Sequence, residues 1–304
     1  MRVLLTGASG VLGSAIADAL LARGDEVVGL TRDPERARST NPTATWHKWD
    51  AALERPPTDA FDQVEGVVNL IGEAINQRLT DAAKRRVRES RVTATRNLVQ
   101  AIGGLPRESR PRVLVSQSAA GYYGDRGDDL LDEAAGPGPD FLAQLCVDWE
   151  AAAADAADLD LRVVVFRTAP VLTPSAGLLK QLLPPFRLGL GGPLAGGRWY
   201  LPWIHIDDVV KLFLWALSNE EASGTFNAAA PDQVTNREFS KGLGRVLGRP
   251  AILPAPKLAV RVAFGGELAD AVTSSLRLVP RRALDAGYEF SYGELEPALR
   301  DLLG

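Results

Sequence analysis

The feature that most constrains the fold is a glycine-rich turn close to the N-terminus. Gly7, Gly10 and Gly13 lie between an apolar run, Arg2–Thr6, and a stretch from position 12 whose apolar residues recur at helical spacing. In a strand–turn–helix unit such glycines allow a tight turn, close approach of a pyrophosphate, and packing of the helix on the sheet. The free N–H groups and positive dipole end of the helix attract phosphate. We therefore expect a dinucleotide here, with a purely structural turn as the alternative, and the expected contact residues are Gly7, Ser9, Gly10, Val11, Leu12 and Gly13.

Strand-like and helix-like segments alternate after this turn. The apolar, β-rich runs are Glu26–Leu30, Gly66–Ile71, Arg112–Ser116 and Leu161–Arg167. Helix-like stretches separate them, above all Asp81–Ala101 and Phe141–Ala157. This alternation predicts βαβ units, and therefore an α/β protein with a Rossmann-type, doubly wound parallel sheet.

The composition of the chain changes after about Arg167, where prolines and glycines become frequent. A capping box at 235–238 then begins a further helix. We expect a dinucleotide-binding domain over residues 1–170, to which 203–230 returns. Residues 171–202 and 231–304 are expected to form a smaller C-terminal α/β lobe for a substrate or a partner.

Composition excludes several classes of protein. The net charge is −4 and the basic residues are scattered, which gives no reason to expect a nucleic-acid partner. With Cys146 as the only cysteine and two histidines, we expect neither a disulfide framework nor a metal site. The chain lacks a run of about 18 uncharged apolar residues, and its N-terminus enters a strand without a signal-peptide core. We expect a cytoplasmic protein that does not bind membranes.

The residues after the second predicted strand bear on the choice of dinucleotide. An NAD site usually has an acidic residue there, which binds the ribose hydroxyl. This chain has Thr31 followed by Arg32, and a guanidinium can bind a 2′-phosphate that an acid would repel. Asp33 comes next and leaves an acidic reading open, and Arg32 could also be a solvated loop residue. We expect NADP(H), with NAD(H) as the less favoured cofactor.

Several motifs together carry a family resemblance. They are the glycine turn, Val68-Asn69-Leu70-Ile71-Gly72, Ser116-Gln117-Ser118, Tyr122-Tyr123-Gly124 and Trp203-Ile204-His205-Ile206-Asp207-Asp208. The chain resembles an extended short-chain dehydrogenase/reductase. Further motifs narrow this to an atypical, sugar-nucleotide-epimerase-like branch that also carries a cell-division-inhibitor label, and they are Phe186–Pro193, Phe226–Pro231 and Asp148-Trp149-Glu150.

The resemblance implies a Rossmann-type nucleotide domain and a small C-terminal lobe, with the substrate bound between them. It implies that Leu70 and Ile71 pass behind the adenosine–pyrophosphate side of the cofactor, and that Gly72 also belongs to the cofactor-binding residues. Asp50 would lie near the adenine, or would cap a turn instead. Extended members often dimerise through two helices, so a homodimer is a further expectation from the resemblance alone.

The chain departs from the family at the catalytic positions. Short-chain dehydrogenases use a tyrosine with a lysine four residues later, whose charge helps the phenol to transfer a proton. None of the five tyrosines here has that lysine, and alignment on Glu150 places Leu142 and Cys146 at the two positions. Arg91 stands where the family has an asparagine, and could supply the missing cation to the cofactor or form a surface ion pair. Cys146 could line the nicotinamide side or be a buried helix cysteine.

Three residues remain as catalytic candidates. Ser118 could hydrogen-bond a substrate carbonyl or hydroxyl, or cap its strand. Tyr122 and Tyr123 could donate a proton, or pack under the nicotinamide. His205 precedes two aspartates, but a structural histidine is favoured there, and Glu133 is expected to be solvated.

Two functions follow as hypotheses. The first is an NADP(H)-dependent epimerase or oxidoreductase acting on an unidentified small carbonyl or sugar-nucleotide substrate without the usual tyrosine–lysine pair. The second is a non-catalytic NADPH-binding sensor or regulatory protein. The intact glycine turn favours the first hypothesis, and the missing catalytic pair favours the second.

Overall fold

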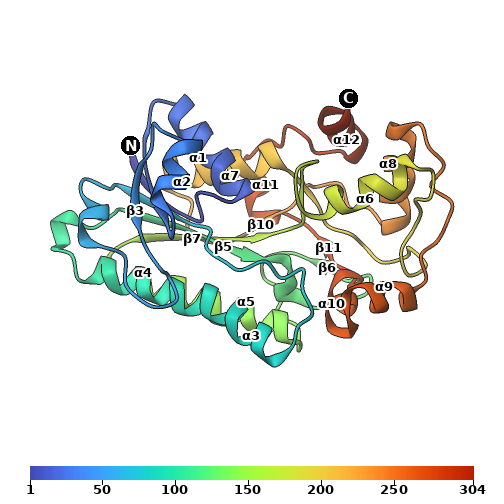
Figure 1. The fold of residues 1–304 in the computed structure, drawn as a ribbon, viewed down its shortest axis with the longest axis horizontal. Coiled ribbons are helices and arrows are strands. Elements are labelled where there is room, and N and C mark those ends of the chain that lie inside the picture. The colour runs from blue at the N-terminus through green and yellow to red at the C-terminus, as the bar shows by residue number, and fades with distance from the viewer.

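A computed structural model describes residues 1–304, apart from the side chains of Ala259, Ala263 and Phe264. Its centre is a seven-stranded sheet in the order β10-β7-β5-β4-β1-β2-β3, in which every neighbouring pair is parallel (Figure 1). The strands are β1 Arg2–Thr6, β2 Glu26–Thr31, β3 Thr45–Lys48, β4 Gly66–Asn69, β5 Val113–Ala119, β7 Arg162–Thr168 and β10 Gly224–Ala228. The predicted α/β, Rossmann-type parallel sheet is confirmed.

Helices cover both faces of this sheet, as the near-continuous apolar strands require. One face carries α1 (Val11–Ala22), α2 (Pro34–Thr40) and α7 (Ile206–Ser218), while the other carries α4 (Ala94–Gly103) and α5 (Phe141–Ala154) (Figure 1).

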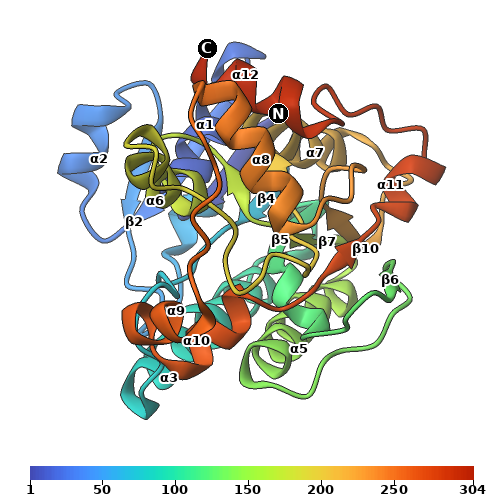
Figure 2. The same ribbon diagram turned by 90° about the vertical axis from the view of Figure 1, so that its right-hand side faces the viewer.

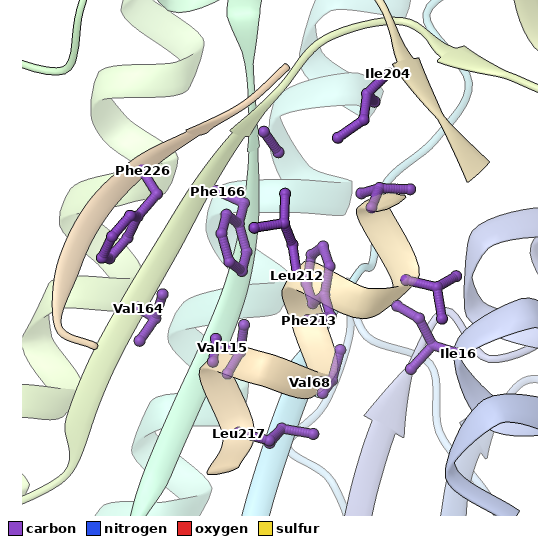
Figure 3. Packing of buried hydrophobic residues seen from close by; sticks show 14 of the residues in the cluster. Ile16, Val68, Val115, Val164, Phe166, Ile204, Leu212, Phe213, Leu217 and Phe226 are labelled. Atoms are coloured by element: carbon purple, nitrogen blue, oxygen red, sulfur yellow. The ribbon is translucent and has the colours of Figure 1, made fainter. Parts of the chain in front are cut away.

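The core beneath α1 and α7 is built from aliphatic and aromatic side chains. Ile16 of α1 and Phe213 of α7 lie over Val68, Val115 and Phe166 of the central strands, and all five are fully buried (Figure 3). At roughly 1.5–3 kcal/mol for each large side chain, this burial fixes the helices on the sheet. The strand ends beyond it are therefore rigid supports for a site.

The helix predicted over Asp81–Ala101 is interrupted. α3 (Asp81–Arg88) passes into a π-helical turn, η2 (Glu89–Thr93), and then into α4. Hydrogen-bond spacing changes within this turn, which shifts the faces presented by the residues after it. Apolar periodicity alone did not reveal this break.

Most of the remaining elements lie beyond the carboxyl ends of the strands (Figure 2), but α11 (Arg281–Asp285) packs beside β10, where Arg282 donates to the carbonyl oxygen of Thr225. Two short parallel pairs, β6 with β11 and β8 with β9, bring together segments that are distant in the chain. A separate core packs α6, α8 and α12 around Trp203, Phe186 and Phe239. The bounds are β6 Leu130–Leu131, β8 Val171–Leu172, β9 Ile204–His205, β11 Arg277–Leu278, α6 Gly177–Arg187, α8 Asn236–Leu247, α9 Lys257–Phe264, α10 Gly266–Val272, α11 Arg281–Asp285 and α12 Leu295–Leu303.

An ion pair is among the contacts that join the C-terminal part to the first residues of the helical segment after β4. Lys84 of α3 forms an ion pair with Glu267 of α10 at 2.7 Å, so α9 and α10 lie beside α3 (Figure 2). Among the helices that the structure describes, none has both the length and the apolarity to cross a bilayer.

Candidate functional site

The glycine turn closes against the loop that follows β4. Gly7 has a φ of +67°, and a Cβ on it would lie 2.9 Å from the carbonyl oxygen of Leu70. A Cβ on Gly13 would come within 2.2 Å of the Gly7 carbonyl oxygen. A side chain at either position would therefore strain the turn or push α1 away from the sheet. The two glycines are therefore required by the packing of the turn against loop 70–72 and of α1 against the turn.

The N-terminus of α1 is open to an anion. Within the described residues its N-cap, Gly10, has no side-chain hydrogen bond, and the first turn of the helix holds no acidic side chain. Ser9, Gly10 and Val11 are exposed, and Leu12 is half-buried. The first N–H groups of a helix have no carbonyl partner within it and carry the positive end of its dipole. The predicted contact residues therefore fit a pyrophosphate.

A hollow of about 530 Å³ lies at the ends of β2 and β3, and its lining includes Arg32, Arg38 and Lys48. Asp33 also lines it, but its carboxylate caps α2 by accepting the backbone N–H of Arg36 at 3.1 Å. This use of Asp33 weakens the acidic reading, because the carboxylate is committed to the helix. Three cations and one further acid, Glu35, thus line the end of β2 at which a dinucleotide ribose binds.

Asp50 lies in a turn just after β3. Its backbone carbonyl accepts the N–H groups of Leu53 at 3.0 Å and Glu54 at 3.1 Å. Its side chain makes no hydrogen bond to any other described residue, so the turn is held by the backbone rather than by the carboxylate. Asp50 is half-buried and is not among the residues that line the hollow.

Asn69, the last residue of β4, organises a buried polar network. Its Oδ1 accepts the hydroxyl of Thr6 at 2.8 Å, and its Nδ2 donates to Thr95 at 2.9 Å and to Ser116 at 3.1 Å. The Thr6 hydroxyl also accepts the backbone N–H of the residue after Asn69. Buried amides that use all these groups hold their neighbours in one geometry. The network fixes where loop 70–72 leaves the sheet.

Arg91 reaches that loop from the π-turn. A Cβ on Gly72 would lie 2.8 Å from the guanidinium carbon of Arg91, so the guanidinium rests on the backbone of Gly72. It also lies over the ring of Trp149, 5.3 Å from the centroid. Burial lowers the pKa of Arg91. Within the described chain Arg91 forms no ion pair, which contradicts the surface-ion-pair alternative.

Cys146 is buried on α5, and its sulfur lies 3.7 Å from the carbonyl oxygen of Ala119. Burial, assisted by the charge of Glu150, raises the pKa of the thiol to about 12. The thiol is therefore neutral and unreactive at ordinary pH, as expected for a buried helix cysteine. Leu142, one turn earlier, is half-buried with its Cβ near Gly121.

Ser118 lies inside the protein rather than at an open strand end. Its hydroxyl donates to Glu150 Oε1 at 2.6 Å, and the side chain is 1% exposed. Arg167 forms a bidentate pair with the same carboxylate, from Nε to Oε1 at 3.0 Å and from Nη2 to Oε2 at 2.9 Å. In this arrangement the Ser118 hydroxyl satisfies a buried ion pair, so the geometry supports a structural use.

The two tyrosines differ in their surroundings. Tyr123 is fully buried, donates to Asn227 Oδ1 at 2.7 Å and accepts from Arg167 at 3.1 Å. Burial raises its pKa to about 12 despite the neighbouring cation. Tyr122 is half-buried, and the guanidinium of Arg167 lies 3.3 Å from the centroid of its ring. Its hydroxyl bonds to no described residue, so of the two phenols it is the one free to meet a ligand.

Glu133 corrects an expectation. Its Oε1 accepts the backbone N–H of Asn227 at 2.9 Å, and its carboxylate also receives the N–H of Arg282 at the start of α11. The side chain therefore joins β10 to α11 and is not merely solvated.

His205 is the N-cap of α7. Its Nδ1 accepts the backbone N–H of Asp207 at 3.1 Å, which places the proton of the neutral ring on Nε2, facing Asp301 at 3.3 Å. The ring stacks on Tyr292 with centroids 3.8 Å apart. Ligating atoms of the histidine and two aspartates lie within 4.8 Å of one another, but the capping bond occupies the Nδ1 lone pair. The structural reading of His205 fits this geometry.

Sequence reasoning missed several residues of these networks. Thr6, Thr95 and Ser116 hold Asn69, and Arg167 neutralises Glu150. A polar residue within an otherwise apolar strand was the available signal, because buried polar groups need partners.

Comparison with known proteins gives a consistent result. Residues 3–229 match the NAD dependent epimerase/dehydratase family, and residues 255–302 match DUF1731, a domain of unknown function. Epimerase family protein SDR39U1 of Homo sapiens is 36% identical over 308 residues, covering 100% of both chains. The chloroplastic SDR39U1 homologue of Arabidopsis thaliana is 36% identical over 303 residues, covering 100% of this chain and 87% of that protein.

Solved structures agree. The crystal structure of human SDR39U1 with NADPH superposes with a TM-score of 0.88 at 34% identity over 99% of both chains. A nucleoside-diphosphate sugar epimerase from Corynebacterium glutamicum gives a TM-score of 0.79 at 31% identity, over 100% of this chain and 58% of that one. The resemblance predicted from the motifs is confirmed: the chain belongs to the NAD-dependent epimerase/dehydratase family, in its SDR39U1-like branch with a C-terminal DUF1731 domain.

Proposed function

We propose that the protein binds NADP(H) in preference to NAD(H). The carrying observation is the open N-terminus of α1, together with three cations at the end of β2. The 2′-phosphate of NADP(H) has a place beside Arg32, Arg38 and Lys48, where the carboxylate of Asp33 is committed to capping α2. A relative 34% identical was crystallised with NADPH, which supports the same cofactor here.

Affinity for the two cofactors tests this proposal. NADPH should bind more tightly than NADH, and Arg32→Ala should reduce that preference by about 10-fold, the order expected for a charge-assisted contact. Arg55→Ala is a matched control, because Arg55 bonds Gln100 and is not among the residues lining the hollow. Equal affinity of the wild type for NADPH and NADH would contradict the proposal.

We further propose an epimerase or oxidoreductase activity on a small carbonyl or sugar-nucleotide substrate. Bound NADP(H) would supply the hydride. The chain would supply loop 70–72 and the α1 terminus to orient it, and Tyr122 as a proton donor with a free hydroxyl. Residues 1–170 with 203–230 would hold the cofactor, and 171–202 with 231–304 would shape the substrate side.

One observation favours a second function, a non-catalytic NADPH-binding sensor. Leu142 and Cys146 replace the proton-transfer pair, and Ser118 and Tyr123 are enclosed in a buried network. Oxidation of NADPH against panels of carbonyl compounds and sugar nucleotides separates the two functions. Turnover that Tyr122→Phe abolishes favours the enzyme, and tight NADPH binding without turnover favours the sensor. We also propose that the protein forms a homodimer, and its sedimentation in solution tests this.

A further inference from the structure

Arg91 is a partly buried cation that forms no close ion pair in the described part of the chain, and the charge of Glu73 acts on it only from a longer distance. Its neighbours on α3 do form ion pairs, Arg86 with Glu73 and Arg88 with Asp148. Arg91 forms none with any described carboxylate, although it is more enclosed than either neighbour. A charge that is partly removed from water and lacks a close partner costs free energy, so such a residue is expected where a ligand brings the opposite charge.

The guanidinium also has unused donors. Nη1 makes two long hydrogen bonds of 3.4 Å, to the Val87 carbonyl and to the Ser90 hydroxyl. A guanidinium carries five N–H groups, and those on Nε and Nη2 have no partner in the described chain. Neither atom is among the enclosed, unsatisfied polar atoms, so both can be reached from solvent.

Three features fix the orientation of this fork. A Cβ on Gly72 would lie 2.8 Å from Cζ, 3.0 Å from Nη2 and 3.1 Å from Nε of Arg91, so the planar group covers the Gly72 backbone. The Trp149 ring supports it from α5. The π-turn supplies the helix face from which it projects, and such turns are frequent at functional sites. Arg91 is therefore held in place before any ligand arrives.

The guanidinium of Arg91 lies near the glycine turn, because both contact loop 70–72. Gly72 follows two residues after Leu70, and the Leu70 carbonyl lies where a Cβ of Gly7 would be. Arg91 therefore faces the loop that closes against the mouth of α1. An anion bound by Arg91 would lie beside the proposed cofactor, on the side of loop 70–72.

We propose that Arg91 is an anion-binding residue, whose Nε and Nη2 donors take a phosphate or carboxylate oxygen bidentately. The anion is either a phosphate of the nicotinamide half of the dinucleotide or a charged group of the substrate. Both sources present the paired oxygens that a guanidinium fork matches. Only the first source rests on the proposed cofactor.

Two ligands distinguish the cofactor source. NADPH contains the nicotinamide half, and adenosine 2′,5′-bisphosphate lacks it. Arg91→Gln should lower the affinity for NADPH by about 10-fold or more and leave the affinity for the bisphosphate unchanged. Arg91→Lys should recover part of the lost NADPH affinity. Arg96→Gln is the matched control, because Arg96 is exposed one turn further on and forms no ion pair in the described chain. Thermal unfolding of each variant verifies that it folds.

Inorganic phosphate tests the substrate source. Titrated into the NADPH-loaded protein, it should shift the Nε–H NMR resonance of Arg91 to saturation and leave that of Arg96 in place. If the wild type does not bind NADPH, the same titration of the free protein still tests Arg91, so the two proposals fail separately. The inference is overturned if phosphate moves neither resonance and Arg91→Gln binds NADPH like Arg96→Gln. The inference is also overturned if Arg91→Gln lowers the affinity for both NADPH and the bisphosphate and Arg91→Lys does not recover either affinity.

Discussion

Arg167 and Glu150 form a bidentate ion pair in the interior, with contacts of 3.0 Å and 2.9 Å and little exposure of either side chain. The pair joins β7 to α5, and through Ser118 it reaches β5. It therefore holds the ends of β5 and β7 against α5.

Glu150→Gln should destabilise the protein by about 3 kcal/mol, because Arg167 would remain buried without its counter-charge. Urea unfolding measures the loss. Ser118→Ala removes a single hydrogen bond to the same carboxylate and should cost only about 1 kcal/mol. If both variants lost the same unfolding free energy, the ion pair would stabilise the fold no more than the single hydrogen bond of Ser118.

Gly13→Ala should disrupt the glycine turn, because its Cβ would lie 2.2 Å from the Gly7 carbonyl oxygen. We expect a loss of several kcal/mol in unfolding free energy, together with loss of NADPH binding. Gly10→Ala is the matched comparison, since its Cβ would lie 3.2 Å from the same oxygen. A Gly13→Ala protein as stable as Gly10→Ala would show that α1 packs less closely than described.

Cys146 should resist alkylation in the folded protein. Its pKa is raised from 9.0 to about 12, so at pH 9 the native thiol stays protonated while an ordinary thiol is half ionised. Iodoacetamide labelling at pH 9 should be rapid only after denaturation. Comparable rates for the native and denatured protein would contradict the burial.

The same shift predicts a stability change at high pH. The folded state favours the protonated thiol, so its contribution is complete below pH 9.0 and is lost as pH rises toward about 12. The Cys146→Ala variant lacks the pH-dependent contribution of the thiol but keeps the contribution of the Tyr123 phenol, whose pKa is also raised. The difference in unfolding free energy between the wild type and this variant should therefore shrink as the pH rises from 9.0 to about 12.

His205 predicts a change at low pH. Burial lowers its pKa below 6.5, and protonation would remove the Nδ1 lone pair that caps α7. The stabilising contribution is present above 6.5 and is lost as pH falls through the lowered value. His205→Asn keeps a capping acceptor that does not titrate, so the loss of unfolding free energy at low pH should be smaller by about 1 kcal/mol than in the wild type. His47→Asn should lose as much unfolding free energy as the wild type. Parallel profiles for the wild type and His205→Asn would refute the assignment.

Much of the fold could be predicted because its signals are local. Apolar runs such as Arg2–Thr6 identify buried strands, and the glycine spacing identifies the first strand–turn–helix unit. The π-turn at Glu89–Thr93 could not be predicted, because apolar periodicity continues almost unchanged through it. Its consequence, the placement of Arg91 against Gly72, depends on two segments that meet only in the folded chain.

The candidate site divides in the same way. By itself the sequence determined that a glycine turn joins the first strand to the first helix and that the tyrosine–lysine pair is missing, because backbone freedom and residue identity are properties of single positions. Only the tertiary structure decided that Ser118 and Tyr123 are enclosed, while the hydroxyl of Tyr122 bonds to none of the residues that the structure describes. Burial and counter-charges come from residues distant in the chain, such as Arg167 and Asn227, and they determine whether a polar group is consumed by the protein or left for a ligand.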